Sequence, residues 1–151
     1  MKNTSQVIPV VGLVCTVALA GYMVVQLNGQ TSSVPSRDFT NAVIAEVRDA
    51  QGRTVLQGKF VAVDEDDDDL ERKATLAQTG WDADAAGEAE IEYAKVAPQE
   101  QEIEFTARNL APGVALTLVV DGIDVATATT DARGRAEAEV VVRMPGAPAT
   151  R

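Results

Sequence analysis

Polar and apolar residues alternate with a period of two along much of the chain after Asp38. The alternation is clearest in four segments, in which apolar residues occupy every second position between mostly charged ones. Because successive side chains of a strand point to opposite faces of a sheet, this pattern predicts half-buried strands of an antiparallel sheet. The apolar positions are Val43, Ala45 and Val47; Ala89, Ile91 and Tyr93; Ile103, Phe105 and Ala107; and Ala136, Ala138 and Val140.

Turn residues separate these segments. Val120–Ile123 (VDGI) puts Asp-Gly between two apolar runs, a strong short-range signal for a β-hairpin. Leu116–Val120 is almost wholly apolar and predicts a more central strand, and Asn109–Gly113 ends in a Pro-Gly turn. Since helical periodicity is lacking here, the sequence predicts an all-β domain over residues 39–143, an Ig-like antiparallel β-sandwich of about seven to nine strands. Residues 144–151 are expected to form a flexible tail.

The tetrapeptide Asp-Ala-x-Gly occurs three times, at Asp49–Gly52, Asp84–Gly87 and Asp131–Gly134. Asp at the first position of a type I turn accepts hydrogen bonds from the following backbone, and Gly at the fourth adopts the left-handed conformation. A calcium loop would need several oxygen ligands at alternating positions, whereas each copy supplies one Asp followed by Ala. The copies therefore predict turns rather than metal sites. The strands that follow them are expected at Arg53–Val63, Glu88–Ala94 and Arg135–Arg143.

A long uncharged segment separates Lys2 from Arg37, and within it Val7–Leu27 is almost wholly apolar. A helix of this length would measure about 31 Å, close to the roughly 30 Å hydrocarbon core of a bilayer. The segment predicts one transmembrane helix, followed by a linker over residues 28–38. Because Lys2 favours the cytoplasmic side, residues 1–6 are expected in the cytoplasm and the domain in the periplasm or outside the cell.

A cleaved signal peptide is the competing interpretation of this segment, since Ala18-Leu19-Ala20 fits a small-x-small cleavage site. Gly12, Thr16 and Ala20 recur every four residues and therefore share one face of the predicted helix. Small residues at this spacing let a second transmembrane helix approach closely, although such residues are also frequent in membrane helices by chance. Docking of other transmembrane subunits is accordingly assigned to Gly12, Thr16 and Ala20.

The run DEDDDDLE at Asp64–Glu71 puts seven acidic residues into eight positions. Mutual repulsion predicts a solvated loop, which would also blunt a sheet edge. One alternative is a docking site for a basic soluble protein through Asp66–Asp69. The other is a weak calcium site, weak because the run lacks a shaping glycine. Its candidate ligands are Asp64, Asp66, Asp67, Asp68 and Asp69.

Two further features are candidates for function. Trp81, the only tryptophan, lies among acidic residues in a turn-rich segment. It is expected to cover one end of the core, with a recognition anchor at an interface as the alternative. Glu100, Glu102 and Glu104 fall on one face of a strand. A solvated face is expected there, although glycoside hydrolysis also uses a pair of carboxyl groups.

Charge and missing residue types narrow the function further. The 151-residue chain has 13 basic and 23 acidic residues, and its net charge of −10 disfavours nucleic acid and anionic lipid surfaces as partners. Histidine is absent, the one cysteine (Cys15) lies in the apolar segment, and every serine precedes Arg37. The predicted domain therefore lacks the groups for serine, cysteine or histidine catalysis and for zinc sites of the Cys/His type. The sequence predicts a protein that is not an enzyme and has no cofactor.

Phe105–Val142 resembles a module of uncharacterised exported bacterial proteins. In that module a strand ends in Leu-x-Pro-Gly, a hairpin carries Asp-Gly or Asn-Gly, and Asp-x-x-Gly introduces a final strand. The resemblance implies an exported all-β domain without known catalytic residues. We therefore expect a structural or accessory subunit of a larger complex, anchored by a single pass in the cytoplasmic (inner) membrane. The alternatives are an extracytoplasmic module that docks a basic protein and a carboxylate-based hydrolase acting through Glu102 or Glu104.

Overall fold

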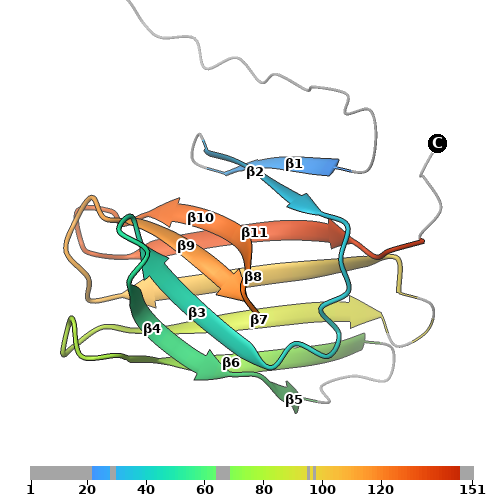
Figure 1. Cartoon of the computed structure of the whole chain (residues 1–151), viewed down its shortest axis with the longest axis horizontal. Helices are drawn as coiled ribbons and strands as arrows, with labels where there is room; N and C mark the ends of the chain where they lie inside the picture. Colours follow the sequence, from blue (N-terminus) through green and yellow to red (C-terminus); the bar gives the residue numbers. More distant parts are fainter. Residues whose placement is uncertain (1–21, 28–29, 64–68, 95, 97, 147–151) are drawn as a thin grey trace, which may run out of the picture.

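The computed structural model describes residues 22–27, 30–63, 69–94, 96 and 98–146 (Figure 1). Every helix or strand in this part of the chain is a β-strand, and all the strand pairs are antiparallel. No helix that could cross a membrane is found among these residues. The strands are β1 (Tyr22–Leu27), β2 (Gln30–Pro35), β3 (Ile44–Asp49), β4 (Thr54–Lys59), β5 (Val61–Val63), β6 (Asp69–Gln78), β7 (Ala86–Ala94), β8 (Glu100–Arg108), β9 (Ala115–Val120), β10 (Ile123–Thr129) and β11 (Ala136–Arg143).

Nine of these strands form one sheet in the order β10-β9-β3-β4-β6-β7-β8-β11, with β5 paired to β6. The sheet curls until its two outermost strands, β10 and β11, lie side by side (Figure 1). The joint between β4 and β6 is narrow, because only Leu56–Gln78 and Gln57–Ala77 pair across it. The prediction of an antiparallel all-β domain is confirmed. The order of hydrogen-bonded strands is continuous through this narrow joint, and the sheet surrounds one hydrophobic core.

The core follows the alternation of the sequence. The inward residues of β7, β8 and β11 are buried, and Ile91, Phe105 and Val140 among them are buried to 98% or more. At β3 the pattern begins one step later than predicted, because Val43 lies before the strand and is 54% exposed. Its N–H and that of Ile44 instead donate to the carboxylate of Asp121, at 3.1 and 2.8 Å.

Two copies of Asp-Ala-x-Gly form the predicted turn, with matching geometry. In each, the Asp carbonyl accepts a hydrogen bond from the Gly N–H, at 2.9 Å in Asp49–Gly52 and 3.0 Å in Asp131–Gly134. Each Asp carboxylate also accepts from two backbone N–H groups further along the turn. Both glycines have positive φ, +75° and +71°. These turns are structural, as the sequence predicts.

The third copy does not form this turn, and the prediction is wrong there. Gly87 lies inside β7, where a Cβ would collide with the carbonyl oxygen of Thr106 on β8. This glycine therefore allows two strands to approach closely and does not supply a left-handed turn residue. Asp121 and Gly122, in contrast, both have positive φ, and β9 and β10 form the predicted hairpin around them.

Two predicted boundaries differ from the structure. The expected strand Arg53–Val63 is divided into β4 and β5 at the buried Phe60, whose N–H donates to Val43 O at 3.0 Å. The acidic run was expected to be a loop throughout, but β6 already begins at Asp69 and pairs with β5. Asp69 to Glu71 are thus part of the sheet. The four aspartates from Asp64 to Asp68 lie outside the described residues.

The N-terminal part departs from the sequence prediction in its second half. Tyr22–Leu27 is strand β1, although the predicted helix was to reach Leu27, and it pairs with Gln30–Pro35, which was expected to be linker. This hairpin lies against β10 and β11 (Figure 1). Gly12, Thr16 and Ala20 lie outside the described residues, so the helix and its docking stripe stay predictions.

Candidate functional site

Glutamates gather on the outer face of four paired strands, β6, β7, β8 and β11. Alternation places every second residue of these strands outward, and glutamate is the most frequent residue in these positions. We call this surface the glutamate face. It consists of Glu71, Glu88, Glu90, Glu92, Glu102, Glu104, Glu137 and Glu139.

Strand register arranges these side chains in rows across the sheet. In one row Glu92 lies opposite both Glu71 and Glu102. In the next, Glu104 lies opposite both Glu90 and Glu139. Residues directly opposite each other have Cβ atoms about 4.5–5.5 Å apart, and like charges in such positions destabilise a sheet. The face therefore opposes folding at neutral pH.

Lys73 is the one cation within these rows among the described residues. Its Nζ lies 2.9 Å from Glu71 Oε1 and 3.1 Å from Glu90 Oε1. Glu71 is only 5% exposed, so this ion pair supports a nearly buried carboxylate. The hydrogen bonds that Lys73 donates, first to Glu71 and then to Glu90, raise the pKa of Lys73.

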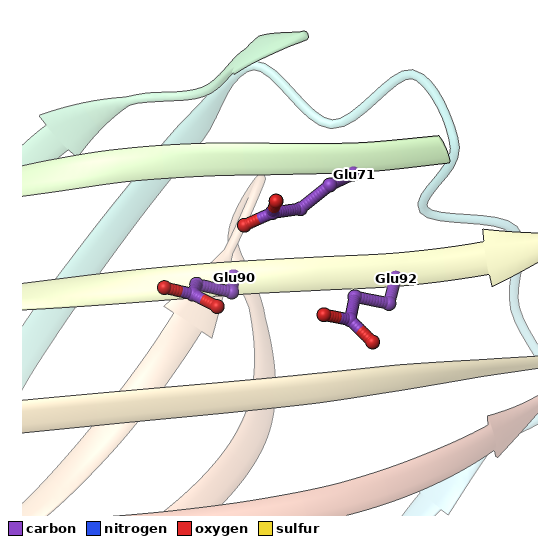
Figure 2. A group of neighbouring side chains, drawn as sticks. All are labelled: Glu71, Glu90 and Glu92. Carbon is purple, nitrogen blue, oxygen red and sulfur yellow. The ribbon is translucent and has the colours of Figure 1, made fainter. Parts of the chain in front are cut away.

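Glu71, Glu90 and Glu92 are the acidic group best placed for a metal ion in the described part of the chain. One carboxylate oxygen of each lies within 4.8 Å of the others, and the three side chains come from neighbouring strands (Figure 2). The ammonium of Lys73 already contacts two of them, so a cation would have to displace it. The group alone does not make a metal site.

The two glutamates that are most enclosed by like charges have raised pKa values. Burial and then the charge of Glu139, which also shares a hydrogen bond with it, raise the pKa of Glu102. Burial raises the pKa of Glu104, and the charges of Glu90, Glu137 and Glu139 add to this effect. Glu102 and Glu104 therefore hold protons more tightly than isolated carboxylates do. Glu102 and Glu104, the residues of the alternative hydrolase hypothesis, are surrounded by other carboxylates on the outer face of the sheet.

Two of the partner-docking residues expected from the sequence, Asp69 and Trp81, belong to the described part of the chain, and they lie at or beyond opposite ends of β6. Asp69 is exposed at the start of β6, whereas Trp81 follows the other end of that ten-residue strand. Such a strand is about 33 Å long. Asp64, Asp66, Asp67 and Asp68 lie outside the described residues. The glutamate face lies between the two ends.

Trp81 does not cover the core, so that prediction is wrong; it is 63% exposed. The guanidinium of Arg53 lies over its ring, 4.5 Å from the centroid. Arg53 is held in turn by Asp49, through an Nη2–Oδ2 ion pair of 2.6 Å and an Nε–Oδ2 hydrogen bond of 2.7 Å. The side-chain hydrogen bond from Arg53 lowers the pKa of Asp49. The first Asp-Ala-x-Gly turn thus positions an exposed aromatic ring.

Comparisons with protein-family models, with curated proteins and with solved structures find no match. A proposal for the function therefore depends on the chain's own residues. The sequence analysis did not find the glutamate face, because it considered only the glutamates along β8. Alternating glutamates in β7, β8 and β11 are a visible signal, but the register that joins them is not local.

Proposed function

We propose that the chain is a non-enzymatic, membrane-anchored accessory subunit that docks a basic protein on its glutamate face. The observation that supports this is the like-charge register of the face, with Glu104 opposite both Glu90 and Glu139. A solvated sheet face needs no such rows, since alternating signs would stabilise it. Lysine and arginine side chains of a partner would remove the repulsion on binding, and the attraction would speed encounter.

The shape of the face fits a protein rather than a small cation. Carboxylates recur about 4.8 Å apart across strands and about 7 Å apart along them, over four strands of an open sheet. A partner presenting several basic side chains can contact such a grid at many points. Trp81 offers an exposed, preorganised aromatic group beyond one end of β6, and tryptophan is a frequent anchor in interfaces.

The anchoring part of the proposal comes from the apolar N-terminal segment. We place a single-pass helix in the inner membrane, within the part of this segment that precedes β1, and the domain with its glutamate face outside the cytoplasm. The finer fold assignment, an Ig-like sandwich, belongs to the same proposal. Its support is the narrow β4–β6 joint, which divides the sheet into two halves.

The test is gentle extraction of the full chain from native membranes, followed by native-gel sizing and mass spectrometry of comigrating proteins. We compare the wild type with Glu90→Gln/Glu104→Gln. The matched control is Asp38→Asn/Asp124→Asn, which removes the same charge from exposed positions outside the face and away from Trp81. The proposal expects a basic protein that comigrates at low salt, is lost at high salt and is lost in the glutamate variant alone.

Equal comigration in both double variants, or binding that salt leaves unchanged, would overturn docking at the glutamate face. The same experiment tests the anchor separately. Peptides from Met1–Leu27 in the complex support a retained segment. A free species that begins near Gly21 would show that the segment is a signal peptide, and the domain would then be a secreted binding module.

A further inference from the structure

A cavity of about 630 Å³ lies between β8, β10 and β11, beside the Asp131–Gly134 turn. Its size falls within the range of small-molecule sites, roughly 300–1,000 Å³. The lining is polar on several sides, and threonines of β8 and β10 contribute to it. Arg108 and Arg135 line it as well, which is notable in a chain with a net charge of −10.

The two arginines lie opposite each other on paired strands. Ala136 pairs with Ala107, and the next position in this antiparallel register puts Arg135 across from Arg108. The backbone continues the contact beyond them, because the N–H of Leu110 donates to Gly134 O at 3.1 Å. Two guanidinium groups in such positions repel each other, as like charges do across strands.

Neither guanidinium makes an ion pair within the described part of the chain. Asp131, an acidic lining residue, uses Oδ1 to accept the backbone N–H groups of Arg133 and Arg135, at 2.8 and 2.9 Å. Glu137 also lines the cavity and lies two residues from Arg135 on the same face of β11. Two arginines thus retain free donors at a cavity wall.

We propose that this cavity binds a small oxyanion, a ligand with a carboxylate or phosphate group, through Arg108 and Arg135. The guanidinium fork matches the geometry of both groups and forms two parallel hydrogen bonds with either. The hydroxyl of Thr106 adds a donor at the same wall. An anion placed between the two arginines would also remove their mutual repulsion. This site adjoins the glutamate face at Glu137, which belongs to both, but its binding through Arg108 and Arg135 does not depend on the proposed docking function.

Binding is measured by calorimetry and by the shift in melting temperature of the full chain in a nonionic detergent. The probes are inorganic phosphate and citrate, with ionic strength held constant by sodium chloride. Saturable binding of one or both supports the site, and their relative affinities distinguish phosphate from carboxylate ligands. Absence of saturable binding of both probes up to about 20 mM, a free energy of only about 2.3 kcal/mol, would overturn it.

Three single variants locate the binding. Arg108→Gln and Arg135→Gln are each expected to weaken binding at least tenfold. Arg133→Gln is the control, because it removes the same charge from the same turn but does not line the cavity. Circular dichroism verifies that each variant is folded. An equal loss of binding in the Arg133 variant would indicate general charge attraction and would contradict the proposal. Unchanged binding in the Arg108 and Arg135 variants would place the ligand elsewhere and would contradict it as well.

Discussion

Replacing Glu104 by glutamine should stabilise the domain. The change keeps the shape of the side chain and removes one charge from the centre of the glutamate face. Glu104 has a glutamate directly opposite on both sides, Glu90 on β7 and Glu139 on β11. Burial and these neighbours already raise its pKa, so its ionised form is the unfavourable one in the folded state.

The size of the effect follows from charge separation and screening. Two unit charges about 6 Å apart repel by about 0.7 kcal/mol in water. The two neighbours of Glu104 together therefore oppose folding by about 1 kcal/mol at 0.01 M salt, where the Debye length is about 30 Å. At 1 M salt the Debye length is about 3 Å, and only about 0.2 kcal/mol remains. Using the dielectric constant of water already allows for the partial exposure of the side chain.

Urea unfolding of the full chain, followed by circular dichroism at pH 7, measures this gain at both salt concentrations. Glu100→Gln is the control. Glu100 also points outward from β8 but is not part of the glutamate face, because it lies opposite Arg143, with 3.5 Å between Oε1 and Nε. Its removal should leave the free energy of unfolding unchanged or slightly lower. The electrostatic reasoning fails if Glu104→Gln gives no gain at low salt, if the gain is the same at 1 M, or if the control gains equally.

Three other predictions concern pH, turns and the exposed ring. Because folding raises the pKa values of Glu102 and Glu104, these groups bind more protons in the folded state than in the unfolded chain. Urea resistance should therefore increase as pH falls from 7 towards about 4.5, and a flat profile would contradict this. Gly134→Ala should lower the free energy of unfolding by about 3 kcal/mol, because a Cβ at this position would collide with Leu110 O. Gly52 has a similar positive φ but open space around it, so Gly52→Ala should lower the free energy of unfolding by only about 1 kcal/mol. Trp81→Ala should reduce thermal stability only slightly, because the ring is 63% exposed, and a large loss would place it in the core.

Local pattern accounts for most of the fold. Alternation predicts the inward residues of β7, β8 and β11 because burial on one face acts on every second residue. The turns at Asp49 and Asp131 are predicted because the Asp carboxylate and the left-handed Gly act within five residues. Gly87 is different, since it is required by Thr106 on another strand. The glycine of Asp-Ala-x-Gly is therefore required by a local turn in two copies and by the close approach of a neighbouring strand in the third.

The candidate site could not be found in this way, because it depends on register between distant segments. The sequence drew attention to Asp64–Glu71, where the charge density along the chain is highest. In space, however, β8 lies between β7 and β11, and this order collects glutamates that are up to 68 positions apart, from Glu71 to Glu139. Likewise, the contact between Trp81 and Arg53 joins two segments that are distant in the sequence.

The register also explains why the outer face has two signs. Along β8 and β11 the outward pairs run from Glu104–Glu139 through Thr106–Glu137, and the next outward positions are Arg108 and Arg135. The charge thus reverses from carboxylate to guanidinium within two steps of about 7 Å each. A face of one sign attracts any basic partner in many registers, whereas a face with a boundary favours one orientation, because a displaced partner would meet like charges. Thr106 is the neutral residue at this boundary, and in the two proposals above it separates the surface for the basic protein from the oxyanion cavity.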